Sequence, residues 1–270
     1  MNLTSPREVK EWCLQNGFRP NKTLGQNFLI DRNTLQAIVD AALDGVEPGA
    51  PVLEVGPGLG VLTEELLRRG CTVTAVEKDR VLAGRLGGAL GNPAGLVVTA
   101  GDALALLDRG AIRPDDFAAL VSNLPYQAGT RILLELVQAR APRTMTVLVQ
   151  TEVAERLAAR EGSKARGLAG VWTQLDYDVR IVRKVPPTCF WPRPAVGSSV
   201  VRLDRHERNA SLTAEERRLF HSLTKRAFGQ RRKQLGSIFK DMVQSTSRAE
   251  ELANEDWVAL TKGLIGNEDT

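Results

Sequence analysis

The stretch Glu54-Val55-Gly56-Pro57-Gly58-Leu59-Gly60 decides the fold of this chain. Residues 52–55 form a mostly apolar run typical of a buried strand, and residues 61–69 have the periodicity of a helix. Three glycines between a strand and a helix let the backbone turn sharply and approach a ligand closely. The stretch therefore predicts a ligand-binding loop at the end of the first strand of an α/β fold.

Strand-like and helix-like runs continue to alternate after this loop, as is typical of βαβ units in a parallel sheet. We predict strands at residues 72–76, 96–99, 117–121 and 145–150, with helices at 80–90, 129–139 and 151–160. Two further runs, 179–185 and 198–203, predict a closing antiparallel pair. After His206 only amphipathic helical segments follow, at 213–228, 231–241, 247–254 and 256–264. We expect a Rossmann-like sheet domain over 1–205 and a small all-helical domain over 206–270.

The composition restricts the class of protein. With 270 residues, 43% hydrophobic and 25% charged, the chain is neither disordered nor fibrous. It contains no apolar run of about 20 residues and no signal-peptide pattern at its start, so we expect a cytoplasmic protein without a membrane span. We also expect a monomer. Its three cysteines show no metal or disulfide spacing, and we expect reduced thiols and no metal. A net charge of +4 fits a nucleic-acid partner without requiring one.

The spacing within the glycine loop indicates which cofactor it serves. Dinucleotide folds use G-x-G-x-x-G over a pyrophosphate, whereas this chain has E-x-G-x-G-x-G, which suits S-adenosylmethionine. We expect Glu54, Gly56 and Gly58 to lie at the amino-acid part of the cofactor, with Glu54 bracing the loop. Glu77 ends the second strand, where a carboxylate can accept both ribose hydroxyls, and Asp102 after the third strand can accept the adenine amine. The alternatives are a solvated strand end for Glu77 and an ordinary turn residue for Asp102.

A second motif, Asn123-Leu124-Pro125-Tyr126, follows the fourth strand. The exocyclic amine of adenine is a poor nucleophile, because its lone pair is delocalised into the ring. The Asn123 side-chain oxygen and the Leu124 carbonyl, held by Pro125, can accept both amine hydrogens and favour the pyramidal nitrogen that attacks a sulfonium methyl. Tyr126 offers a ring on which an extruded base can stack. The alternative is an Asn-x-Pro turn followed by a core tyrosine.

These residues and four further stretches resemble the ribosomal RNA adenine dimethyltransferases of the KsgA (RsmA) type, over nearly the whole chain. The further stretches are residues 22–29 (KTLGQNFL), 150–156 together with 190–196 (QTEVAER and FWPRPAV), and 226–233 (RAFGQRRK). The resemblance implies transfer of methyl groups from S-adenosylmethionine to two adjacent adenines near the 3′ end of small-subunit (16S) rRNA during ribosome biogenesis. It implies that Gln26, Asn27 and Leu29 help to enclose the cofactor, which Asn123 also contacts. It further implies that Phe190 faces Tyr126 across the target adenine.

The sequence departs from the family pattern at several positions. Ala195 and Gly197 replace a basic and an acidic residue, Gln127 begins a run that is usually small and polar, and Arg166 replaces an aromatic. None of these positions carries a chemical role, so the departures concern the RNA contacts.

Basic residues gather in two runs that contain no acid, residues 179–203 and 217–233. Such runs are often only solvated faces. The resemblance implies RNA binding by Arg226, Arg231, Arg232 and Lys233, with small-subunit rRNA or a pre-30S particle as partner. We expect His206 and His221 on solvated surfaces, because no partner spacing accompanies them.

Three other functions remain open from the sequence. A large-subunit rRNA methyltransferase of the antibiotic-resistance type shares the fold and the Asn-x-Pro-aromatic motif. A non-catalytic RNA-binding relative would retain the fold but need not retain Glu54, Glu77, Asp102 and Asn123. A nicotinamide oxidoreductase is disfavoured by the spacing of the glycine loop.

Overall fold

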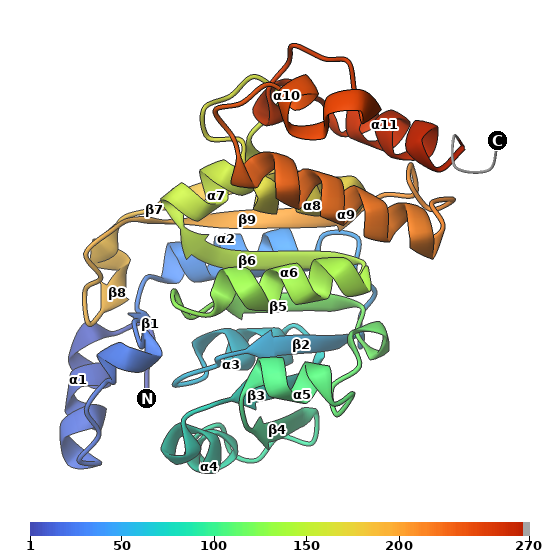
Figure 1. Ribbon diagram of the computed structural model, residues 1–270. Coiled ribbons are helices and arrows are strands. Elements are labelled where there is room, and N and C mark those ends of the chain that lie inside the picture. The colour runs from blue at the N-terminus through green and yellow to red at the C-terminus, as the bar shows by residue number, and fades with distance from the viewer. Residues whose placement is uncertain (267–270) are drawn as a thin grey trace. The chain divides into compact units, whose positions relative to one another are not determined.

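The computed structural model describes residues 1–266 of the chain (Figure 1). These residues pack as two compact units, the first made of residues 1–154 and 180–204, and the second of residues 155–179 and the chain from 205 onward. The strands are β1 (Phe28–Leu29), β2 (Pro51–Val55), β3 (Thr72–Glu77), β4 (Leu96–Ala100), β5 (Ala119–Asn123), β6 (Thr144–Gln150), β7 (Tyr177–Val185), β8 (Phe190–Trp191) and β9 (Ser198–Arg205). The α-helices are α1 (Pro6–Gln15), α2 (Arg32–Leu43), α3 (Val61–Arg68), α4 (Arg80–Ala89), α5 (Ala103–Asp108), α6 (Gly129–Ala139), α7 (Thr151–Ala158), α8 (Leu168–Asp176), α9 (Ala214–Gly229), α10 (Leu235–Phe239) and α11 (Asn254–Gly266).

Seven strands form the main sheet in the order β4-β3-β2-β5-β6-β9-β7. The first five are parallel to their neighbours, and β9 is antiparallel to β6. The predicted α/β fold is therefore confirmed, and the two predicted closing strands are neighbours at the edge of the sheet. From β2 the chain builds outward to β4 and then returns to place β5 on the other side of β2. This reversal is the switch point at which open α/β sheets bind ligands, and the glycine loop and Asn123 both lie at it.

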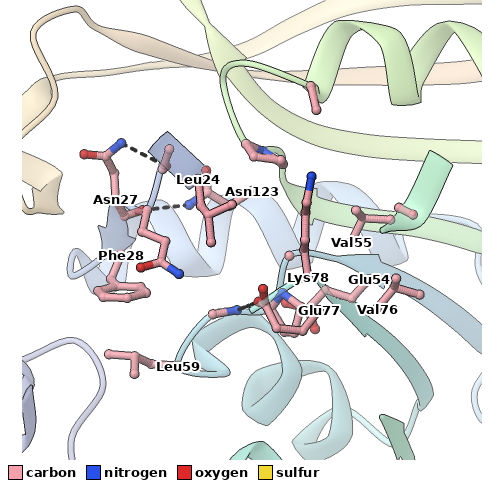
Figure 2. Close-up of a pocket in the computed structure, with 18 of the residues that line it drawn as sticks. Leu24, Asn27, Phe28, Glu54, Val55, Leu59, Val76, Glu77, Lys78 and Asn123 are labelled. Carbon is pink, nitrogen blue, oxygen red and sulfur yellow. Dashed lines mark hydrogen bonds between the residues drawn. The ribbon is translucent and has the colours of Figure 1, made fainter. Parts of the chain in front are cut away.

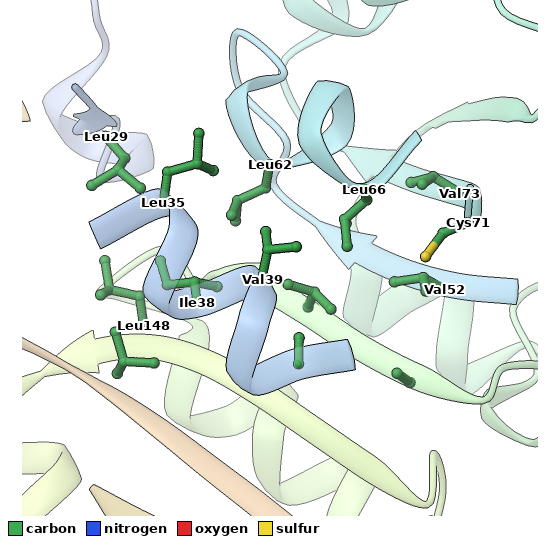
Figure 3. Close-up of a cluster of buried hydrophobic side chains, with 14 of the residues drawn as sticks. Leu29, Leu35, Ile38, Val39, Val52, Leu62, Leu66, Cys71, Val73 and Leu148 are labelled. Carbon is green, nitrogen blue, oxygen red and sulfur yellow. The ribbon is translucent and has the colours of Figure 1, made fainter. Parts of the chain in front are cut away.

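Helices cover both faces of this sheet, with α2 and α3 on one side and α5 and α6 on the other (Figure 1). Leu35, Ile38, Val39 and Ala42 are buried on α2 and recur every three or four residues, so they share one helix face. Figure 3 shows this face between the strands and the side chains of α3. Burial of each large side chain stabilises the unit by about 1.5–3 kcal/mol. This packing holds α3, and with it the glycine loop, against the sheet.

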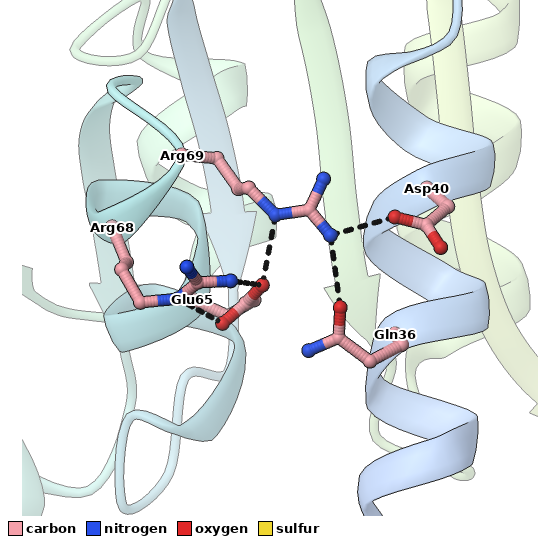
Figure 4. A network of polar contacts seen from close by, with 5 residues as sticks. All are labelled: Gln36, Asp40, Glu65, Arg68 and Arg69. Atoms are coloured by element: carbon pink, nitrogen blue, oxygen red, sulfur yellow. Dashed lines mark hydrogen bonds and ion pairs between the residues drawn. The ribbon is translucent and has the colours of Figure 1, made fainter.

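A polar network at the rim of this core ties α2 to α3 (Figure 4). Arg69 donates to Gln36 at 2.8 Å and to Asp40 at 2.7 Å on α2, and to Glu65 on α3 at 2.9 Å. Hydrogen bonds from Arg68 and Arg69 lower the pKa of Glu65 to about 2. The network fixes the end of α3 that is remote from the glycine loop.

The second unit has its own hydrophobic core, formed by α8, α9, α10 and α11. Its buried members include Val171, Leu175, Phe220, Leu223 and Trp257. The predicted boundary at 205 matches one of the points where the chain passes between units. The assignment of residues 155–179 to the sheet domain, however, was wrong, because α8 contributes two of these core side chains to the helical unit.

Two of the predicted C-terminal helices are shorter than the sequence indicates. Within 231–241 the α-helix covers only Leu235–Phe239, and within 247–254 only a 3-10 turn forms, Ala249–Glu251. The amides of Leu235 and Gly236 donate to the carbonyls of Ser247 and Ser245, so loop pairing replaces further helix. Helices α1 and α2 were not predicted. Ser5 caps the first and Asp31 the second, each accepting from a backbone amide three residues on.

Candidate active site

A pocket opens at the switch point of the sheet, with about 1110 Å³ of space including its mouth. Residues at the ends of β2, β3 and β5 line it together with a strap, residues 23–29, that runs between α1 and α2 (Figure 2). All nine residues predicted to bind the cofactor line this one pocket: Gln26, Asn27, Leu29, Glu54, Gly56, Gly58, Glu77, Asp102 and Asn123. The fold thus brings together side chains from five separate segments of the sequence.

The glycine loop has the geometry that only glycine adopts easily. Gly58 and Gly60 have φ angles of 59° and 90°, and Gly60 caps α3. A Cβ atom on Gly60 would lie 2.6 Å from the side chain of Leu86, and one on Gly58 would lie 3.1 Å from the Phe28 ring. These positions keep the loop pressed against its surroundings and leave its backbone facing the pocket.

Glu77 holds the glycine loop from the neighbouring strand. Its two carboxylate oxygens accept from the amides of Gly58 at 3.0 Å and Asp79 at 2.8 Å. Burial raises its pKa, against the lowering effect of these amides. The alternative of a solvated strand end is therefore wrong, since the side chain is buried and hydrogen-bonded at the pocket.

Glu54 lies deeper than Glu77 and is only 1% exposed. Its Oε2 accepts from the Thr63 hydroxyl on α3 at 2.6 Å, whereas Oε1 makes no hydrogen bond within residues 1–266. Burial raises its pKa to about 8, and repulsion from Glu77 adds to this shift. Glu54 therefore braces the start of α3 through Thr63, and one oxygen remains for a ligand.

Asp102 caps α5 by accepting from the amide of Leu104 at 2.9 Å. Its other oxygen lies 2.8 Å from Nζ of Lys78, which also lines the pocket. The hydrogen bond from Lys78 lowers the pKa of Asp102. Lys78 was not predicted as a site residue, although its place directly after Glu77 at a strand end was a usable signal.

Asn123 is held in one orientation by the strap. Its Nδ2 donates to the carbonyl of Asn27 at 3.1 Å, so its Oδ1 is left as an acceptor (Figure 2). The amide of Leu124 donates to the carbonyl of Leu148 at 3.2 Å, which fixes the next peptide. Asn27 in turn donates to the Gly25 carbonyl at 3.1 Å. The strap and the Asn-Leu-Pro-Tyr segment are therefore one hydrogen-bonded assembly.

The two aromatic residues predicted to face each other across the target base, Tyr126 and Phe190, differ in their surroundings. Tyr126 is half-buried, and its hydroxyl lies 2.6 Å from the hydroxyl of Ser198 on β9. Phe190 is 3% exposed and packs in the core with Leu29 and Val185, so its ring does not line the pocket. Its neighbour Trp191 is partly exposed and stacks on Phe28, which does line the pocket. A contact between Phe190 and the target base stays a prediction.

The four predicted RNA-binding residues divide into two pairs. Arg226 donates to the Ile238 carbonyl at 2.9 Å and lies over the Phe239 ring, and Arg231 donates to the Lys164 carbonyl at 2.8 Å and lies 3.5 Å from Glu250. These contacts support the fold of the second unit. Arg232 and Lys233 are exposed.

The expectation for His221 was wrong. Its ring packs edge-on against Trp172 at 4.7 Å and near Phe220, and burial lowers its pKa. His206 is also partly covered, and its amide donates to the carbonyl of Asp176 at 2.9 Å. Both histidines thus belong to the packing of the second unit.

Residues 1–266 contain neither a candidate metal centre nor a candidate membrane span. No cluster of three or more His, Cys, Asp or Glu side chains there could hold a metal ion. Nor does any helix in that range combine the length and apolarity needed to cross a membrane.

Comparisons with known proteins agree with this geometry. The chain is 40% identical to the ribosomal RNA small subunit methyltransferase A of Mycobacterium tuberculosis (strain ATCC 25177 / H37Ra), over 100% of this chain and 90% of that protein. The crystal structure of a dimethyladenosine transferase from Plasmodium falciparum has a TM-score of 0.77 over 89% of this chain and 98% of that one, at 22% identity. The 23S rRNA methyltransferase ErmE has a TM-score of 0.69 over 88% of this chain and 100% of that one, at 26% identity.

The sheet order and the glycine-loop pocket at the switch point define a Rossmann-like methyltransferase fold. A model of one family within this class, ribosomal RNA adenine dimethylase, matches residues 17–262. The chain belongs to that family.

Proposed function

We propose that the protein transfers methyl groups from S-adenosylmethionine to the exocyclic amines of two adjacent adenines near the 3′ end of 16S rRNA. The observation that carries this proposal is the placement of Asn123. Its Nδ2 is bound to the Asn27 carbonyl, so its oxygen can accept from an amine at the mouth of a pocket lined by acidic residues. The family and the 40%-identical relative support the same reaction.

The acidic side chains that line the pocket fit S-adenosylmethionine. Glu54 and Glu77 are buried carboxylates with no Lys or Arg partner among residues 1–266, which suits a ligand that carries a sulfonium, an ammonium and ribose hydroxyls. Glu54 would hold the ammonium end, Glu77 the ribose and Asp102 the adenine amine. When bound, the cofactor supplies a methyl group that its sulfonium already activates.

The residues of the Asn-Leu-Pro-Tyr segment would act on the target adenine. Asn123 Oδ1 and the Leu124 carbonyl accept the two amine hydrogens and hold the nitrogen lone pair toward the pocket. Tyr126 stacks against the extruded base. A singly methylated amine has one hydrogen to donate, so only one of the two acceptors is engaged in a second transfer.

The choice of RNA is supported by relatives and by charge. The small-subunit relative matches the whole chain, whereas ErmE, a 23S rRNA methyltransferase, is 26% identical. Arg232 and Lys233 on the second unit, and Arg183 and Arg193 on the first, are exposed and available to phosphates. We propose small-subunit rRNA or its pre-30S particle as partner, in the cytoplasm, with the protein acting as a monomer.

The test is mass spectrometry of rRNA from cells that lack this protein, followed by primer extension on each rRNA to locate dimethyladenosine. We expect loss of dimethyladenosine from two adjacent positions near the 3′ end of 16S rRNA, restored by the intact gene. Loss from 23S rRNA would establish the large-subunit alternative. Unchanged methylation of both RNAs would overturn the proposal.

A further inference from the structure

Ser198 contacts the ring that the proposed reaction needs, and no sequence motif identified it. It is the first residue of β9, is 0% exposed, and places its Oγ 2.6 Å from the Tyr126 hydroxyl. In the register of the sheet it lies opposite Gln150, the last residue of β6. Its hydroxyl therefore sits beside the carboxyl end of β6, level with the pocket edge of the sheet.

The position of Ser198 is itself rigidly fixed. The antiparallel ladder between β6 and β9 runs without interruption from Thr144↔Asp204 to Gln150↔Ser198. Just beyond it the Thr151 amide donates to the Gly197 carbonyl at 3.0 Å. A hydroxyl on so well-anchored a backbone can define where a partner side chain lies.

Tyr126 is consequently held at both of its ends. Its backbone belongs to the turn into α6, where the amide of Gly129 donates to the Pro125 carbonyl at 2.7 Å. Its hydroxyl is held on β9, two strands away from β5 in the sheet order β5-β6-β9. The ring must span the end of β6, which restricts its χ1 rotation. Burial raises the pKa of the Tyr126 hydroxyl, and either hydroxyl of the pair can donate to the other.

We propose that Ser198 is a positioning residue for methyl transfer, which sets the plane of the Tyr126 ring on which the target adenine stacks. This inference rests on the proposed function and adds a residue to it. A preorganised ring spares the enzyme the entropy of ordering that side chain when the base arrives. Removing the hydroxyl should slow transfer and leave the cofactor end of the pocket unaffected, because Ser198 does not line the pocket.

The chain offers a matched control in the next residue. Ser199 is also 0% exposed on β9, but its hydroxyl lies 3.1 Å from that of Thr151 and not near Tyr126. Ser198→Ala and Ser199→Ala each remove one buried hydroxyl from the same strand. Any general weakening of β9 should affect both variants alike.

The experiment measures kcat and KM for methylation of 16S rRNA, cofactor affinity and Tm for Ser198→Ala, Ser199→Ala, Tyr126→Phe and the Ser198→Ala/Tyr126→Phe double variant. We expect Ser198→Ala and Tyr126→Phe each to lower kcat by about fivefold, the factor that one lost hydrogen bond of about 1 kcal/mol gives. The double variant should be no slower than either single variant, since both remove the same bond. With 2-aminopurine at the target position, Ser198→Ala should increase fluorescence because stacking on the ring is looser.

Three outcomes would overturn the inference: wild-type kcat in Ser198→Ala, equal loss in Ser199→Ala, or additive losses in the double variant. A wild-type protein that methylates no adenine would instead refute the proposed function, so the two failures can be told apart.

Discussion

The buried Asp176 of the second unit and the buried Glu54 and Glu77 of the first unit serve different ends. In the second unit Asp176 is paired with Arg217, whose two terminal nitrogens lie 2.7 and 3.1 Å from its carboxylate oxygens. In the first unit Glu54 and Glu77 are as deeply buried, but backbone amides and a threonine hydroxyl are their partners, and burial raises the pKa of both. A paired carboxylate holds the fold. The other two leave lone pairs without a cationic partner facing a pocket, which is a property of a binding site.

We expect the largest effect from substitution of Asn123, the neutral acceptor beside these carboxylates. Asn123→Ala should lower the rate of methyl transfer about 10²- to 10³-fold, because it removes an acceptor that matters most as the amine becomes pyramidal. Initial rates on 16S rRNA with labelled cofactor measure this. The control is Gln138→Ala, an exposed amide on α6. Wild-type turnover by Asn123→Ala would exclude its assigned role.

Substitution of Asp176, the carboxylate paired with Arg217, should lower the stability of the protein. Asp176→Ala leaves Arg217 only 18% exposed and without its main partner, so we expect the free energy of unfolding to fall by about 3 kcal/mol. Urea denaturation at pH 7 measures the change. The exposed pair of Arg208 and Asp178, at 2.7 Å, is the matched control, and Asp178→Ala should change stability by less than about 1 kcal/mol. Equal effects would remove the distinction between buried and exposed pairs.

Glu77 should respond chiefly in ligand affinity. In Glu77→Gln one of the two backbone amides faces an NH2 group, and a ribose hydroxyl loses a charged acceptor. We expect the Kd for S-adenosylmethionine to rise about tenfold, measured by calorimetry. Glu64→Gln removes the same charge from an exposed position on α3 and should leave Kd unchanged. A similar Kd in both variants would mean that Glu77 only holds the loop.

Glu54 provides the most specific effect, a dependence of stability on pH. Its pKa in the folded protein, about 8, is above its ordinary value of 4.5, so the folded state binds the extra proton between these values. Its contribution to stability is therefore complete below about pH 4.5 and is lost as pH rises toward 8, by at most about 1.4 kcal/mol per pH unit. Denaturation of wild type and Glu54→Gln from pH 5 to 9 isolates this slope as a difference. Parallel curves would show that Glu54 is ionised throughout.

A bound cation favours the ionised form of the Glu54 carboxyl, whereas burial without a ligand favours the protonated form. In the proposed complex, ionised Glu54 would attract the ammonium of S-adenosylmethionine, so affinity should increase with pH in the same range in which stability without ligand decreases.

The sequence predicted the pocket well because its motifs are contiguous and each ends a strand. Once β2, β3 and β5 were assigned, parallel pairing alone brought Glu54, Glu77 and Asn123 to one edge. Contacts between distant segments could not be predicted in this way. The place of Lys78 after Glu77 indicates a site residue but not its contact with Asp102, and nothing local to Ser198 indicates its contact with Tyr126. Those contacts depend on strand register and on side-chain length.

The different environments of the basic residues in the second unit could not be predicted from the sequence either. Arg226, Arg231, Arg232 and Lys233 look equivalent in the sequence, but burial of neighbouring carbonyls gives the first two internal partners. Likewise α8 resembles any helix of an α/β fold. Which core Val171 and Leu175 join is decided by the matching apolar faces of α9 and α11, far along the chain.

The division of the chain has a consequence for dissecting the protein. Residues 155–179 belong to the helical unit but lie in the sequence between the two segments of the sheet unit. No single truncation point therefore separates the two units. A fragment that stops at 205 would keep Leu175, Val171 and the buried guanidinium of Arg166 while losing Asn254, its hydrogen-bond partner at 2.8 Å. Such a fragment exposes the apolar face of α8 and leaves the Arg166 guanidinium without its Asn254 partner, which favours aggregation and proteolysis. Deletion of the C-terminal segment is therefore a poor test of RNA binding, and point substitutions on its exposed face are the sound approach.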